Sequence, residues 1–276
     1  MKSKVFSSSI LFAVFLFTSC VSVKKTTVTN NESILPTREY SVQSVMWQQN
    51  ASEYRALCYQ AFNTAKMRLD IILANHPSPD KKLAIITDID ETVLDNSPYN
   101  AKLIIDDQEY TREEWVNWGN QITAEAIPGS KTFLNYAQSK GVEIFYISNR
   151  FVEQQATTLE NLKKVGFPYA DNEHLLLMPD GEGSSKQKRF DKVAENYTVV
   201  LFMGDNLGDF SSSFLVNSTD KRNELTDALE ADFGVQFIVL PNPMYGDWET
   251  KGIYKGQHNL TEKQKKTLQK ASLKTY

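Results

Sequence analysis

The chain has 276 residues, of which 41% are hydrophobic and 23% charged, a composition typical of a folded globular protein. Its 30 basic and 34 acidic residues leave a formal net charge of −4. That balance argues against a nucleic-acid groove and against a basic patch for lipid headgroups, so an anionic ligand would need local cations or a metal.

The first twenty residues have the three-part layout of an export signal. Lys2 and Lys4 precede an apolar run over 10–17, which is shorter than the about 20 residues a membrane helix needs. Ser19 before Cys20 resembles the lipobox of bacterial lipoproteins, with Phe17 where Leu is usual. We expect a signal peptide over 1–19 and lipidation of Cys20. An uncleaved anchor is the alternative.

The residues after Cys20 set the domain organisation. The segment 21–36 is rich in Thr, Asn, Ser and Lys, which predicts a lipidated tether over 20–36 and a folded body over 37–276. If Cys20 carries lipid, only Cys58 remains of the two cysteines, and an intramolecular disulfide is impossible.

Apolar periodicity predicts a long amphipathic helix from Ser44 to Asn75, with Cys58 on its buried face as a packed thiol. Strands and helices then alternate. The expected strands cover 83–87, 142–148, 174–178, 198–203 and a segment ending at 240. The expected helices follow Thr111, cover 130–140, 152–166 and 186–195, precede the last strand, and occupy the Lys-rich tail. This alternation predicts an α/β fold with a mainly parallel sheet covered on both faces.

One segment interrupts the alternation. Residues 106–127 contain Trp115 and Trp118, and a capping box, Thr111 with Glu114, opens a helix within it. We expect this segment to form a helical cap together with the N-terminal helix.

Polar clusters follow three of the predicted strands. Asp88 and Asp90 follow the first, 148–150 the second, and 204–210 the strand over 198–203. Each cluster alone would also fit an ordinary turn. Because ligands bind outside the carboxyl ends of parallel strands, their joint placement predicts one site at one sheet edge.

The first cluster suggests phosphoryl transfer. Asp88 and Asp90 point the same way from an extended chain, and such carboxylates repel unless a cation or a proton separates them. Mg²⁺ would suit the carboxylates of Asp88 and Asp205 with the backbone carbonyl of Asp90. Asp88 could then attack phosphorus to form an aspartyl-phosphate, while Asp90 protonates the leaving oxygen and later activates water. We expect an acidic pH optimum.

Two further side chains have the right chemistry for a phosphate. Ser148 and Lys186 offer a hydroxyl and an ammonium to the phosphoryl oxygens, where negative charge develops. For Lys186 the alternative is a solvated residue on a helix surface.

Four motifs carry a resemblance to a known family. The stretches 88–96, 148–150, 184–186 with Arg189, and 204–210 together resemble the haloacid dehalogenase (HAD) superfamily. More closely, they resemble the class C bacterial acid phosphatases, the lipoprotein e(P4) family, over about 47–249. The resemblance implies a Rossmannoid parallel sheet with a helical cap. It also implies an Mg²⁺-dependent hydrolase of small phosphomonoesters, nucleoside 5'-monophosphates included.

The resemblance also assigns roles to positions. Asp88 becomes the nucleophile, Asp90 the acid/base and Asp205 a metal ligand, with Asp209 a supporting carboxylate near the metal. The positions around the phosphate and substrate are Thr92, Ser148, Asn149 and Lys186. Aromatic candidates for stacking on the substrate are Tyr245, Trp118 and Tyr99, although most aromatic residues belong to cores. Gly208 replaces a second acid, and Asp247 replaces a glycine, found in some members.

Other readings stay open at this point. A non-catalytic surface binding lipoprotein is one alternative, and transfer of the phosphoryl group to an alcohol is another. The three histidines lack an Arg-His-Gly context, which disfavours the histidine acid phosphatase mechanism. We expect a bacterial cell-envelope protein, held at the outer membrane through Cys20, with homodimerisation possible and no nucleic-acid partner.

Overall fold

The computed structural model describes residues 39–75 and 80–276, which belong to one compact unit, Leu35–Tyr276. The predicted signal peptide, Cys20 and the tether lie outside the described residues. Among the helices that are described, none combines the length and the hydropathy needed to cross a membrane.

The centre of the fold is a five-stranded sheet in the order β5-β4-β1-β6-β7, and its neighbouring strands pair in parallel. The strands are β1 (Leu83–Thr87), β4 (Glu143–Phe151), β5 (Leu175–Met178), β6 (Thr198–Gly204) and β7 (Phe237–Val239). The predicted strands are confirmed, although β4 starts one residue later than the segment 142–148 and ends three residues beyond it. Because β1 is central, its carboxyl end lies in the middle of the sheet edge.

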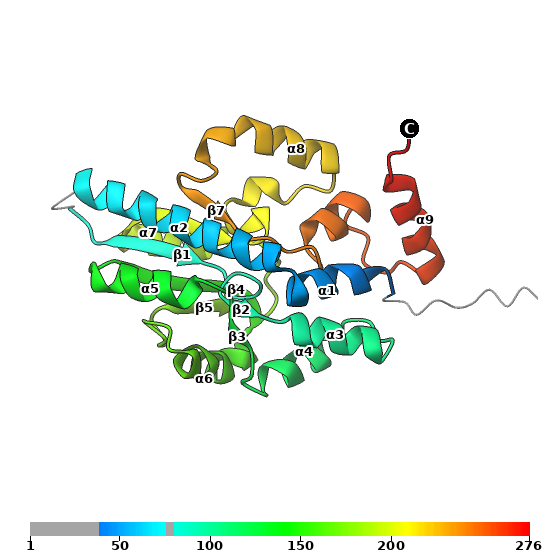
Figure 1. The fold of residues 1–276 in the computed structure, drawn as a ribbon, viewed down its shortest axis with the longest axis horizontal. Coiled ribbons are helices and arrows are strands. Elements are labelled where there is room, and N and C mark those ends of the chain that lie inside the picture. The colour runs from blue at the N-terminus through cyan, green and yellow to red at the C-terminus, as the bar shows by residue number, and fades with distance from the viewer. Residues whose placement is uncertain (1–38, 76–79) are drawn as a thin grey trace, which may run out of the picture. The chain divides into compact units, whose positions relative to one another are not determined.

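Helices cover both faces of the sheet (Figure 1). One face carries α2 (Ser52–Asn75), α5 (Ser130–Ser139) and α6 (Gln155–Val165), and the other carries α7 (Gln187–Asn196). Successive side chains of β1 alternate between the two cores: Ile85 packs with the first group, and Ile86 packs against Phe190 of α7. This arrangement confirms the α/β fold.

The long N-terminal helix differs from its prediction in two ways. It is divided into α1 (Val42–Asn50) and α2 by Ala51, whose backbone is extended, and the sequence offers no large apolar anchor between Trp47 and Tyr54. In addition, α2 packs against the sheet through buried Cys58 and Leu69, so it is not part of a cap. Burial raises the pKa of the Cys58 thiol to about 11, as expected for a packed, unreactive cysteine.

The cap is an insertion between β1 and α5. It contains β2 (Leu94–Asp95), α3 (Ser97–Ile105), α4 (Arg112–Gly119) and β3 (Glu125–Ala126), with β2 and β3 antiparallel. Thr111 caps α4 as predicted, its hydroxyl accepting from the Glu114 N–H at 3.1 Å. Because β2 and α3 precede residue 106, the insertion begins earlier in the chain than the predicted cap. Helix α1 packs against α3 of the insertion.

Most of the remaining elements follow β6. A short 3-10 helix, Leu207–Asp209, leads to α8 (Thr219–Ala228), and after β7 a π-helix, Trp248–Ile253, leads to α9 (Glu262–Ser272). Further 3-10 helices cover Glu39–Ser41, Val152–Gln154, Ser212–Phe214 and Glu230–Asp232. The chain after β7 thus returns to the carboxyl edge of the sheet, where it forms one wall of a cavity.

Candidate active site

The end of β1 carries the predicted acid pair. The N–H of Asp88 donates to the carbonyl of Met203 at 2.9 Å, so pairing with β6 continues one residue past the strand. The chain then turns sharply, with the N–H groups of Val93 and Leu94 both donating to the carbonyl of Ile89 at 2.9 Å. Within this turn Glu91 has a φ of 59°, a conformation that few non-glycine residues adopt. The turn places Asp90 on a different side of the site from Asp88.

Lys186 lies beside the first carboxylate. Its ammonium is 3% exposed, donates to Asp88, and donates to Asp209 at 2.7 Å. Burial opposes the charge, but the carboxylates of Asp209 and Asp88 raise the pKa of Lys186 to about 12. Lys186 is therefore a buried cation within the site, and the alternative of a solvated helix residue is wrong.

Three carboxylates gather around this lysine. Oxygens of Asp88, Asp205 and Asp209 all lie within 4.8 Å of one another. Asp205 directly follows β6, and Asp209 can come close because Gly204, the last residue of β6, has no side chain. A Cβ on that glycine would lie 2.3 Å from the Cβ of Asp209. The tight packing at Gly204 is thus part of how the cluster is built.

Burial and mutual repulsion make the ionised forms of these carboxylates unfavourable, which raises the pKa of two of them. Burial, followed by the carboxylates of Asp209 and Asp88, raises the pKa of Asp205 well above its usual range. Burial raises the pKa of Asp88 to about 7 despite the nearby ammonium of Lys186. A hard divalent cation prefers clustered oxygen donors such as these, and it would compete with protons for them. The residues present therefore fit a metal site.

Asp90 is held in a separate environment. Its carboxylate accepts from Arg150, at 3.0 and 3.1 Å from Nε and 2.7 Å from Nη2, from Ser148 Oγ at 3.2 Å, and from Asn96 Nδ2 at 2.9 Å. Arg150 is 1% exposed. Sequence reasoning assigned no role to Arg150 or Asn96, although both stand inside the two motifs that it singled out.

Two predicted phosphate-binding residues contact protein groups instead. Thr92 is buried, and its hydroxyl donates to Asp205 at 3.1 Å, so it orients a carboxylate of the cluster. Asn149 lines the cavity, but its amide donates to the carbonyl of Ser184 at 2.9 Å and accepts from Arg189 at 2.6 Å. These bonds tie the C-terminal part of β4 to the start of α7 and to the loop that carries Lys186.

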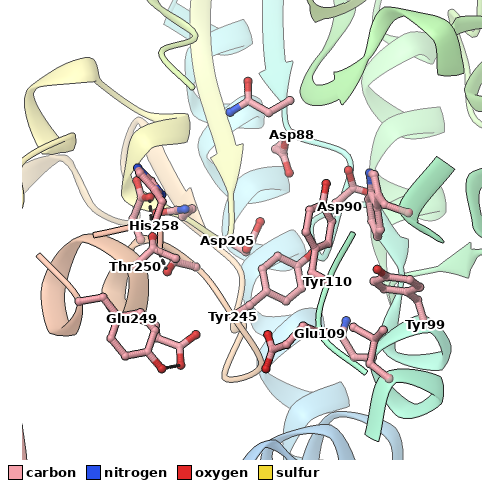
Figure 2. A pocket seen from close by; sticks show the side chains of 18 of the residues that line it. Asp88, Asp90, Tyr99, Glu109, Tyr110, Asp205, Tyr245, Glu249, Thr250 and His258 are labelled. Carbon is pink, nitrogen blue, oxygen red and sulfur yellow. Dashed lines mark hydrogen bonds between the residues drawn. The ribbon is translucent and has the colours of Figure 1, made fainter. Parts of the chain in front are cut away.

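A cavity of about 500 Å³ opens in front of the carboxylates. In Figure 2, Asp88, Asp90 and Asp205 lie at one end of it, and the rings of Tyr110 and Tyr245 lie farther out. Aromatic residues also line it from the cap and the C-terminal segment: Tyr99, Trp115 and Tyr254. Tyr245 and Tyr99 thus lie where a substrate ring could stack.

Two further aromatic residues, and the two positions at which this chain differs from some members of the family it resembles, lie in or near the cavity wall. Trp118 is not among the residues that line the cavity, and its indole N–H donates to Asn96 at 2.7 Å behind it. Sequence reasoning missed Tyr110, which only the unusual segment over 106–127 could have signalled. Asp247 lies on the cavity wall near Arg222 and Lys251, at 3.9 and 3.7 Å, and Gly208 packs close to Leu215.

Comparison with known proteins matches this site to a family. The family described as HAD superfamily, subfamily IIIB (acid phosphatase), matches residues 9–248. This chain belongs to that family. Membership agrees with the motifs that suggested it, because the matched range includes the four aspartates of those motifs that line the cavity.

Solved and curated relatives support the same family. A class C acid phosphatase from Bacillus anthracis, solved with tungstate bound, superposes with a TM-score of 0.82 at 42% identity, over 86% of this chain and 98% of that one. A stem 28 kDa glycoprotein of Glycine max is 30% identical over 78% of this chain and 74% of its own length. Acid phosphatase 1 of Solanum lycopersicum is 28% identical over 58% of this chain and 57% of its own. The subfamily IIIB chain described here is a phosphatase.

Divalent cations should stabilise this phosphatase more at neutral than at acidic pH. The folded-state pKa values of Asp88, about 7, and of Asp205 lie above the ordinary 3.8. In the metal-free protein, their contribution to stability is therefore complete below about pH 4 and is lost as the pH rises through about 7. A cation competes with those protons, so it restores stability mainly where they have left.

Thermal unfolding with and without MgCl₂, near pH 5 and near pH 8, measures the effect. We expect a larger rise of the midpoint near pH 8, and we expect Asp205→Asn to remove most of it. An equal rise at both pH values would contradict metal binding at this cluster.

Proposed function

We propose that this phosphatase uses Mg²⁺ to hydrolyse phosphomonoesters, nucleoside 5'-monophosphates among them, through an aspartyl-phosphate on Asp88. The observation that carries the proposal is the separation of the acid pair. Asp88 lies among Lys186 and the acidic cluster, whereas Asp90 lies against Arg150. Two carboxylates in different environments are suited to two different roles.

The metal proposal rests on charge. The cavity wall contains more acidic than basic residues, so a phosphate dianion would be repelled from it without a cation. The carboxylates of Asp88, Asp205 and Asp209 would hold Mg²⁺, which when bound neutralises the phosphoryl oxygens and favours the ionised form of the nucleophile. The buried ammonium of Lys186 adds a second positive charge at the same place.

The reaction follows from the two environments. An oxygen of Asp88 attacks phosphorus, the bond from phosphorus to the ester oxygen breaks, and Asp90 transfers a proton to the departing alkoxide. In the second step Asp90 removes a proton from water as the water oxygen attacks the aspartyl-phosphate. The bond from phosphorus to Asp88 breaks, and inorganic phosphate leaves. Ser148 donates to Asp90 from beside the phosphate position.

The substrate proposal rests on the cavity. Its volume of about 500 Å³ lies in the range of sites that bury a small organic ligand. Aromatic rings at its outer end suit a base or sugar beyond the phosphate. The Bacillus anthracis enzyme was solved with tungstate, a tetrahedral oxyanion. Membership of a phosphatase family argues against the non-catalytic alternative. If an alcohol attacked the same intermediate in place of water, the enzyme would act as a phosphotransferase.

Asp88→Asn should lower kcat for p-nitrophenyl phosphate by at least about 1,000-fold, because the nucleophile is removed. The matched control Asp220→Asn changes an exposed aspartate of α8 and should keep full activity. Mass spectrometry of acid-quenched enzyme should find a phosphoryl group on the peptide that contains Asp88. A variant that keeps its rate in pure protein would contradict the mechanism.

Tyr245→Ala should raise KM for a nucleoside 5'-monophosphate by roughly tenfold, because stacking on an aromatic ring contributes about 1–3 kcal/mol per base. KM for glycerol phosphate, which has no ring, should change less than about twofold. Tyr245→Phe keeps the ring and serves as the control. Equal effects on both substrates would argue against a base-stacking role for Tyr245.

We further propose a lipid anchor on Cys20, at the bacterial outer membrane, supported by the lipobox in the sequence. A single acyl chain binds membranes weakly, so stable anchoring takes the several chains that a lipoprotein cysteine carries. Cells that express the full chain should incorporate radiolabelled palmitate into it, and Cys20→Ala should abolish the label. A label that persists in Cys20→Ala would contradict the anchor.

A further inference from the structure

Asn96 is fully buried, where the turn after β1, the cap and the C-terminal part of β4 meet. Its Nδ2 donates to Asp90 Oδ1 at 2.9 Å, and its Oδ1 accepts from the indole N–H of Trp118 at 2.7 Å. Arg150 Nη2 also approaches the same Oδ1 at 3.5 Å. The amide of Asn96 therefore links helix α4 of the cap directly to the carboxylate of Asp90.

The indole of Trp118 makes the shortest of the hydrogen bonds that fix which way that amide faces. Longer contacts favour the same orientation, with Arg150 Nη2 on the oxygen and with Glu91 Oε2 at 3.4 Å and the Leu94 carbonyl at 3.5 Å on the NH₂. If the amide were rotated by half a turn, its oxygen would face the carboxylate of Asp90, and its NH₂ would face the Trp118 N–H. Both contacts would then pair like groups, since an indole N–H can donate only and an ionised carboxylate can accept only. Trp118 thus supplies the donor that keeps the Asn96 NH₂ directed at Asp90.

The two oxygens of Asp90 consequently differ. Oδ1 accepts from Arg150 Nη2 at 2.7 Å, from Arg150 Nε at 3.0 Å and from Asn96. Oδ2 accepts two longer bonds, 3.1 Å from Arg150 Nε and 3.2 Å from Ser148 Oγ. Oδ1 already has more donors than its two lone pairs accept well, so Oδ2 is the oxygen that can exchange a proton with substrate.

We infer that Trp118 and Asn96 are positioning residues, which hold the carboxyl of Asp90 so that Oδ2 faces the leaving oxygen of the substrate. This inference rests on the proposed role of Asp90 as general acid. It gives Trp118 a task other than stacking on substrate, in agreement with its place behind the cavity wall. It also makes the cap part of the proton-transfer machinery, because α4 carries the indole.

The dependence on leaving group separates a positioning role from a structural one. An alkoxide leaving group needs its proton during bond cleavage, whereas p-nitrophenolate is a weak base that leaves with little help. Trp118→Phe removes the donor and keeps an aromatic ring. The comparison uses kcat/KM, which includes only the steps up to formation of the aspartyl-phosphate. We expect kcat/KM for glycerol phosphate to fall by roughly tenfold, a fraction of the 10²–10⁴ that general acid catalysis contributes. We expect kcat/KM for p-nitrophenyl phosphate to fall by less than about threefold.

Two matched variants complete the experiment. Trp47→Phe changes a half-buried tryptophan of α1 outside the site and should alter neither rate. Asn96→Asp keeps the oxygen that accepts from Trp118 but turns an oxygen toward Asp90, and it should reproduce the selective loss more strongly. Thermal unfolding of each variant shows whether it is folded.

The outcomes distinguish this inference from the proposed function. Asp90→Asn should show the same selectivity for the alkyl ester in kcat/KM, which excludes the later hydrolysis step that both substrates share, and if it does not, the general-acid role itself fails. If Asp90→Asn is selective but Trp118→Phe slows both substrates equally, or neither, the positioning inference is overturned while the proposed function stands. A rise in KM alone for Trp118→Phe would show that the residue contacts substrate and would also overturn the inference.

Discussion

Repulsion among carboxylates at the carboxyl edge of the sheet is the constraint around which the site is organised. Asp88, Asp205 and Asp209 approach one another within 4.8 Å, and burial with mutual repulsion raises the pKa of Asp88 and of Asp205. The ammonium of Lys186 offsets part of that charge. Disrupting such a buried ion pair typically costs about 3–5 kcal/mol, because the remaining charge has no partner. The carboxylate cluster therefore keeps negative charge that a bound cation would neutralise.

The same constraint explains why the acid pair is divided between two partners. A regular strand would leave Asp88 and Asp90 side by side on one face. The turn over 89–94, with Glu91 at positive φ, instead carries Asp90 to the guanidinium of Arg150. One carboxylate then faces the cluster and Lys186, while the other is surrounded by hydrogen-bond donors. This division of partners allows two identical side chains to do different chemistry.

The cap completes the site from above the sheet edge. It supplies rings that line the cavity, such as Tyr99 and Trp115, and through Trp118 and Asn96 it contacts the carboxylate of Asp90 from behind. The C-terminal segment supplies the opposite wall, including Tyr254 and His258. The edge of the sheet positions the charged groups, and the cap and the C-terminal segment form the cavity walls around them.

The sequence by itself determined the succession of strands and helices along the chain, the periodicity of the helices, and which motifs lie at the carboxyl edge of the sheet. These depend on short-range alternation and on residues that stand next to one another, such as the apolar run before Asp88. It did not predict the break at Ala51, the packing of α2 on the sheet, or the hydrogen bonds of Thr92 to Asp205 and of Asn149 to Ser184 and Arg189.

Only the tertiary structure decided the partners of the acid pair. Arg150 lies 60 residues from Asp90, and Trp118 lies 22 residues from Asn96. No local pattern marks such pairs, because an arginine after a strand or a tryptophan on a cap helix fits many surroundings equally well. Which donor reaches which oxygen depends on how the strands register and how the cap packs, and those are properties of the whole folded chain.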